Sequence, residues 1–126
     1  MNKIKVTYYT HESQFNLCSN EKVTQCVMSI SGIGDSRVVV SEQWPSGDCP
    51  ITDSMLPSEV LDCIEERLES YWFSSRREER RAAIAKIRER MLDVDAAWIE
   101  DQIADHERKI LSLRASLASL REQEQI

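Results

Sequence analysis

The stretch that decides the fold is residues 95–123, DAAWIEDQIADHERKILSLRASLASLREQ. Apolar side chains recur in it at steps of alternately four and three residues, which is the spacing of the a and d positions of a coiled coil. Seven positions form this seam, and all but the histidine are apolar: Ile99, Ile103, His106, Ile110, Leu113, Leu117 and Leu120. The spacing predicts a long helix whose seam packs against a second helix.

Charges beside the seam predict how two copies pair. The e positions are two glutamates followed by two arginines: Glu100, Glu107, Arg114 and Arg121. Antiparallel copies bring e positions together, so each glutamate meets an arginine of the partner, whereas parallel copies place Lys109 opposite Arg114. We therefore expect an antiparallel homodimer through residues 95–123. The competing arrangement is that residues 76–91 of the same chain cover the seam.

The two histidines predict no catalysis. His106 sits at a d position, where a polar side chain fixes the register of a seam or makes it sensitive to pH. His11 is followed by Glu12 and Ser13, but adjacent residues in a turn rarely converge on one point. We expect no catalytic residues and no enzyme.

Before the seam, the first part of the chain has the period of strands. Residues 4–10 alternate, with Ile4, Val6 and Tyr8 on one face. Residues 22–31 and 37–44 continue with further strand patterns, and residues 15–18 allow a short extra strand. The glycines at 31–36 suit a hairpin loop rather than a phosphate-binding loop, because a strand follows them. These patterns predict an antiparallel meander of three or four strands.

A loop and an amphipathic helix follow the strands. The loop contains Trp44, which either faces a partner or folds over the sheet edge. Residues 57–72 repeat apolar positions at helical spacing and are expected to pack on the sheet. Three consecutive aromatics end this helix and cannot all point one way, so they join Trp44 as candidates for partner binding: Tyr71, Trp72 and Phe73.

Residues 76–90 form a basic segment, with seven basic side chains against three acidic. Four arginines make it the best candidate for nucleic-acid binding: Arg76, Arg77, Arg80 and Arg81. Because Glu78 and Glu79 interrupt the run and the rest of the chain is acidic, the preferred interpretation is a face that is either solvated or paired with carboxylates of the same chain.

A first apolar seam precedes the main one and is one residue out of phase with it: Ile84, Ile87, Met91, Val94 and Trp98. One continuous helix would have to turn its apolar stripe by about 100° between the two seams. We therefore expect a break at residues 92–95, with Asp95 capping the second helix, which gives a helical hairpin.

Composition sets the class of protein. The chain has 126 residues and a net charge of −6, with three glycines and three prolines, which fits one folded, helix-rich domain with an appendage. No apolar run approaches the roughly 18 residues of a membrane span, and the first residues lack a signal sequence, so a cytoplasmic location is expected. The four cysteines are then free thiols, with a zinc site that includes His11 as the alternative.

Together these patterns predict an α+β fold. Residues 1–73 are expected to form a small domain of sheet and helix, and residues 74–126 a helical coiled-coil extension for oligomerisation. The expected function is that of a homodimeric protein-interaction module, an inhibitor or accessory factor that occupies the surface of a larger enzyme or complex. A nucleic-acid-binding protein is the alternative. No cofactor, metal or membrane is expected, and a protein partner is favoured over nucleic acid.

Overall fold

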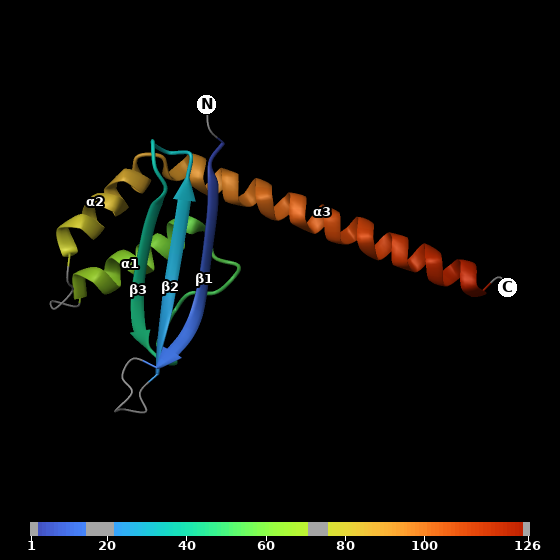
Figure 1. Ribbon diagram of the computed structural model, residues 1–126, viewed down its shortest axis with the longest axis horizontal. Helices are drawn as coiled ribbons and strands as arrows, with labels where there is room; N and C mark the ends of the chain where they lie inside the picture. The colour runs from blue at the N-terminus through green and yellow to red at the C-terminus, as the bar shows by residue number, and fades with distance from the viewer. Residues whose placement is uncertain (1–2, 15–21, 71–75, 125–126) are drawn as a thin grey trace.

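A computed structural model describes residues 3–14, 22–70 and 76–124 (Figure 1). Three strands come first and three helices follow: β1 (Lys5–Gln14), β2 (Lys22–Ser31), β3 (Val38–Pro45), α1 (Pro57–Ser70), α2 (Arg77–Arg88) and α3 (Met91–Glu124). This order confirms the predicted α+β fold with a long C-terminal helix. The short strand considered at residues 15–18 and the aromatic run Tyr71, Trp72 and Phe73 lie outside the described residues.

The sheet is the predicted antiparallel meander, with strand order β1-β2-β3. Its register places Val6 opposite Ile30 and Met28 opposite Val40. Gly32 starts the loop between β2 and β3 with φ at 90°, as expected for a hairpin loop. A Cβ there would lie 2.4 Å from the carbonyl oxygen of Lys3. Glycine therefore lets the loop pass close to the backbone that leads into β1.

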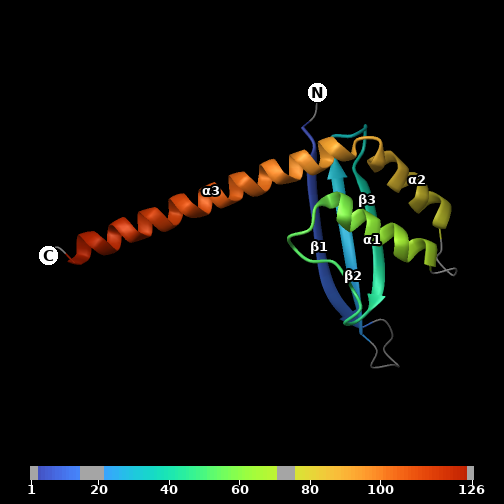
Figure 2. The same ribbon diagram turned by 180° about the vertical axis from the view of Figure 1, so that it is seen from behind.

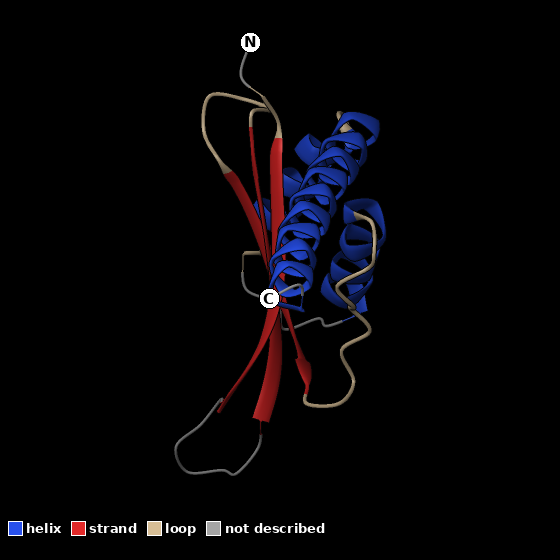
Figure 3. Ribbon diagram, turned by 90° about the vertical axis from the view of Figure 1, so that its right-hand side faces the viewer, coloured by secondary structure: helices blue, strands red, loops and turns tan. Residues whose placement is uncertain are grey.

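Helices cover one face of the sheet and leave the other open (Figure 3). Alternate strand residues form the covered face and are buried, among them Val6, Met28, Ile30 and Val40. Each helix contributes buried apolar residues to the same core: Val60, Leu61, Ile64 and Leu68 from α1, Ile84 and Ile87 from α2, and Val94 and Ala97 from α3. The core lies between the sheet and this helical layer.

All three helices contribute to the core, whereas the sequence predicts that the single helix at residues 57–72 closes it. Helices α1 and α2 both contact β3, while α3 contacts β1. Three strands spaced about 4.8 Å apart are wider than one helix of about 10 Å diameter, so one helix cannot cover them. Helix α2 and the start of α3, which carry the first apolar seam, cover the rest of the sheet. A domain division at residue 73 stays a prediction.

The helix break lies earlier than expected, at Glu89 and Arg90 rather than at residues 92–95. The backbone hydrogen bonds of α2 end where the Arg90 N–H donates to the Ile87 carbonyl oxygen at 3.0 Å. Helix α3 is continuous from Met91. Asp95 does not cap α3. Its carboxylate accepts from the Ser58 N–H at the start of α1, at 2.9 Å, so it serves the N-terminus of a neighbouring helix instead.

Helix α3 leaves the sheet soon after it starts and projects away from the rest of the chain (Figure 1). Helices α2 and α3 diverge from their shared turn when seen from either side (Figure 2). The second helix therefore does not lie along the third.

Candidate interaction surface on the last helix

The seam of α3 is exposed. Val94 is fully buried and Ala97 is 9% exposed, yet the apolar seam residues beyond them are 41% to 60% exposed: Ile99, Ile103, Ile110, Leu113, Leu117 and Leu120. His106 is exposed too. Contiguous apolar surface of this kind marks interaction sites in proteins. Six of the ten exposed large apolar side chains in the described residues belong to the seam.

The exposure follows from the phase of the two seams. Helix α3 carries both of them without a break, because Val94 and Trp98 point to the core while Ile99 begins the second seam one position later. One residue turns a helix by about 100°, so a helix lying on the sheet through Val94 directs Ile99 and Ile103 away from it. The predicted alternative, in which residues 76–91 cover the seam, is not what the structure shows.

A hollow of about 350 Å³ lies at the base of the seam. Five residues of α3 and two of the loop before α1 line it: Trp98, Ile99, Gln102, Ile103, His106, Asp53 and Ser54. The hollow thus continues the apolar seam onto the globular part of the molecule.

The loop is held beside α3 through an aromatic pair. Trp98 stacks on Tyr8 of β1, with ring centroids 6.0 Å apart. The Tyr8 hydroxyl donates to the Met55 carbonyl oxygen at 2.5 Å and also lies 3.1 Å from the carbonyl oxygen of Thr52. Partial burial, with the negative charge of Asp53 as the next cause, raises the pKa of Tyr8, so the hydroxyl stays protonated and able to donate.

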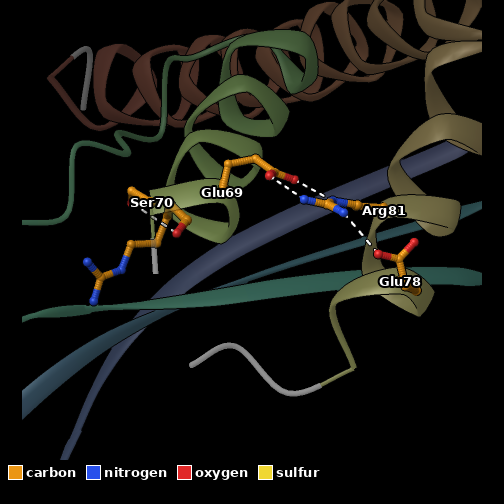
Figure 4. Close-up of polar contacts among 5 residues, drawn as sticks. Glu69, Ser70, Glu78 and Arg81 are labelled. Carbon is orange, nitrogen blue, oxygen red and sulfur yellow. Dashed lines mark hydrogen bonds and ion pairs between the residues drawn. The ribbon is translucent and has the colours of Figure 1, made fainter. Parts of the chain in front are cut away.

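Arginines of the basic segment are bound to carboxylates of the same chain. Arg81 makes a forked contact, 2.5 Å to Glu69 of α1 and 2.9 Å to Glu78 of α2 (Figure 4). Hydrogen bonding from Arg81 lowers the pKa of Glu69, and the same contact raises the pKa of Arg81. Arg80 lies 2.7 Å from Glu42, the one buried charged residue among those described.

Two further arginines of the segment also form ion pairs with carboxylates of the same chain. Arg76, immediately before α2, lies 2.7 Å from Glu79, and Arg88 lies 2.6 Å from Asp62 of α1. Arg77 is the first residue of α2. The pair of Arg76 lies at the start of α2, whereas those of Arg80, Arg81 and Arg88 join α2 to β3 and α1. This pairing supports the preferred interpretation of the segment over nucleic-acid binding.

The burial of Trp44 removes it from the candidates for partner binding. It is 7% exposed, because β3 runs on to Pro45 and directs the indole into the core. A partner cannot reach it without unfolding that strand. Tyr71, Trp72 and Phe73, the other candidates, stay predictions.

The thiols and His11 lie in different surroundings. Cys26 is fully buried and its pKa is raised to about 12, mainly by desolvation. His11 is exposed and stacks on Tyr9, with ring centroids 5.8 Å apart. Within residues 3–14, 22–70 and 76–124, no three metal-ligating side chains gather closely enough to hold an ion.

Sequence reasoning found the seam but missed the hollow. The seam follows from spacing within one helix, whereas the hollow depends on where the loop at Asp53 and Ser54 meets α3. Tyr8 and Trp98, which set that meeting point, are far apart in the chain and carry no local signal of contact.

None of the helices in the described part of the chain combines the length and apolar character needed to cross a membrane. Comparisons with protein-family models, with curated proteins and with solved structures found no match.

Proposed function

We propose that this protein is a non-enzymatic interaction module that pairs with a second copy of itself through α3. The observation that carries the proposal is the exposed seam, because apolar side chains at coiled-coil spacing gain most by packing against another helix. In this role the dimer occupies the surface of a larger enzyme or complex, as an inhibitor or accessory factor.

A second copy is the occupant that the charges favour. In the antiparallel pairing that stacks Ile103 on Leu120, Glu107 meets Arg114 of the other copy and Glu100 meets Arg121. Twofold symmetry doubles both contacts. Each exposed pair contributes only roughly 0.2 to 1 kcal/mol, so the apolar seam supplies the affinity and the charges select the direction.

The same charges select one register. Sliding one helix by a heptad in one direction puts Glu107 opposite Glu107 of the other copy, and sliding it in the other direction puts Arg114 opposite Arg114. Only the register that stacks Ile103 on Leu120 leaves every e position opposite a residue of opposite charge. Like charges brought together in this way oppose the shifted registers.

An antiparallel dimer places the two globular parts at opposite ends of the paired helices. Each sheet then keeps its uncovered face, where Tyr9 is 54% and Val39 is 47% exposed. These faces offer a larger partner two equivalent contact surfaces. Affinity capture from the native host, with wild type beside a Tyr9→Ser/Val39→Ser variant, tests this part of the proposal: a protein that binds wild type alone supports it, and equal capture by both contradicts it.

Two leucines of α3 provide a matched test of pairing. Leu113 on the seam is 60% exposed and Leu111, two residues away and off the seam, is 64% exposed. Sedimentation at micromolar concentration should show a dimer for wild type and for Leu111→Asp, and a monomer for Leu113→Asp. A monomeric wild type would contradict the proposal, and so would equal effects of the two substitutions.

Nucleic-acid binding through Arg76, Arg77, Arg80 and Arg81 is the alternative. A retention assay on duplex and single-stranded DNA and RNA tests it, since phosphate contacts weaken steeply as salt is raised. Because carboxylates of the chain already contact Arg80 and Arg81, we expect no retention even at low salt.

A further inference from the structure

The hollow at the base of the seam lies on one definite side of α3. Gln102, which lines it, is at a g position, and Ile99 and His106, which also line it, are the d residues on either side of Ile103. In an antiparallel pair of helices the g edges of the two copies face each other, with the d residues on that side. The hollow therefore opens toward the g edge of an incoming second helix.

The favoured register brings one apolar residue of the second copy to this place. Leu120 is the last apolar residue of the seam, and it stacks on Ile103 of the other copy. Leu120 is itself a d residue, so its side chain lies on the g side, between Ile99 and His106. Gln123, the last g residue of α3, then faces Gln102.

We propose that the hollow is the seat for the C-terminal end of α3 from a second copy, with Leu120 of that copy filling it. This inference rests on the proposed antiparallel dimer and extends its interface from the helices onto the loop at Asp53 and Ser54. Twofold symmetry gives the dimer two such seats, one at each end.

The dimensions and lining of the hollow fit this occupant. A cavity of about 150 Å³ holds a benzene ring, so 350 Å³ has room for a leucine side chain and part of the next turn. Trp98, Ile99 and Ile103 supply apolar walls, and Gln102 supplies a polar rim for Gln123. Helix pairing alone would leave the apolar walls of the hollow only half covered, because the seam position that follows Leu120 in the second copy is the charged residue Glu124.

The seat also assigns a function to the contacts that position the loop. The Tyr8 hydroxyl fixes the loop at Met55, and the Tyr8 ring stacks on Trp98. Together these contacts join the loop, which forms one wall of the hollow, to α3, which forms the other. A wall on the globular part stops the second helix from sliding further, which reinforces the register that the e positions favour.

Cysteine cross-linking tests the seat directly. In a Ser54→Cys/Gln123→Cys variant, mild oxidation should link two chains, because the new thiol at 123 of one copy lies beside that at 54 of the other. Within one chain the link cannot form, since residues 102 and 123 are about 30 Å apart along the helix and a disulfide needs Cα atoms within about 7 Å. The matched control is Ser36→Cys/Gln123→Cys, which keeps the native cysteines and moves one new thiol to the exposed loop between β2 and β3.

Filling the hollow gives a second readout that needs no new thiol. Ser54→Trp should weaken dimerisation about tenfold or more in sedimentation experiments, because the indole competes with Leu120 for the same space. Ser36→Trp should leave the dimer unchanged, and circular dichroism confirms that both variants fold.

Failure of the seat and failure of the dimer give different results. A wild type that sediments as a monomer overturns both proposals. A wild-type dimer that shows neither the 54–123 cross-link nor any weakening by Ser54→Trp overturns the seat alone. Cross-linking of the Ser36 control at the same rate also overturns it, since contact would then not depend on the hollow.

Discussion

The indole of Trp98 stacks on the phenol ring of Tyr8, with their planes 24° apart. Trp98 belongs to α3 and Tyr8 to β1, so the pair fixes the start of the projecting helix on the edge strand of the sheet. The Tyr8 hydroxyl adds the loop at Met55 to the same junction. Three separate segments thus meet at one tyrosine, and the direction in which the exposed seam leaves the sheet depends on it.

Tyr8→Phe should lower the free energy of unfolding by about 1 kcal/mol, the usual net value of one hydrogen bond, while keeping the ring stack. Urea denaturation measures this change. Tyr9→Phe is the control, because Tyr9 is 54% exposed on the open face of the sheet. Equal costs for the two substitutions would mean that the hydroxyl of Tyr8 contributes nothing to the junction.

Two glycines with positive φ offer a second matched comparison. Gly32 has φ at 90° and Gly47 at 95°, but a Cβ on Gly47 meets nothing within 4 Å, whereas on Gly32 it would lie 2.4 Å from the Lys3 carbonyl oxygen. Gly47→Ala should cost about 1–2 kcal/mol for its backbone conformation alone. Gly32→Ala should cost about 1–3 kcal/mol more, because the Lys3 backbone must shift. Thermal melts of the two variants beside wild type measure the difference.

The sequence predicted those features that depend on neighbours along the chain. Alternation placed Ile4, Val6 and Tyr8 on one face of a strand. Ile4 and Val6 are buried in the core and Tyr8 packs against it. The seam spacing predicted a long helix, and α3 runs from Met91 to Glu124. These features are periodic, so a few residues suffice to define them.

Features that depend on distant contacts were misplaced or missed. The break before α3 came earlier than expected because Val94 packs in the core from within α3, and no glycine or proline marks the turn. The sequence places Trp44 in a loop, where it could face a partner, yet β3 includes it. The basic segment predicted a face that is either solvated or paired with carboxylates of the same chain, and only the packing of α2 beside α1 identifies Glu69 as the partner of Arg81.

The buried thiol of Cys26 predicts a loss of stability at alkaline pH. Desolvation raises its pKa from 9.0 to about 12, so the fold favours the protonated thiol. This contribution is fully present below about pH 9 and is lost as the pH rises toward 12, because the unfolded chain releases the proton first.

The free energy of unfolding of Cys26→Ala should therefore fall less between pH 9 and pH 11 than that of wild type. Urea denaturation at several pH values measures both slopes. The raised pKa of Cys63 acts in the same direction in both proteins and cancels in the comparison. The raised pKa of Tyr8 is caused mainly by burial, which both proteins share, and only in smaller part by the charge of Cys26, which the substitution removes. Parallel slopes would show that Cys26 titrates normally.

Arg114 separates the two directions of helix pairing. In the antiparallel dimer it faces Glu107, so Arg114→Glu replaces two attractive contacts by two repulsive ones and should weaken dimerisation about tenfold. In a parallel dimer it faces Lys109, so the same substitution would strengthen the pairing. The residues three and four positions away on either side of Arg114 are all uncharged (Ile110, Leu111, Leu117 and Ala118), which keeps effects within the helix small.

Restoring the charge pair completes this test. Glu107→Arg/Arg114→Glu re-forms both contacts of the antiparallel dimer with the signs exchanged, so its affinity should return to that of wild type. Glu107 likewise has no charged residue three or four positions away along α3. Sedimentation equilibrium at low and high salt measures all three proteins, and the difference between them should shrink as salt screens the exposed charges. A single variant that dimerises more tightly than wild type would establish parallel pairing and remove the register on which Leu120 reaches Ile103.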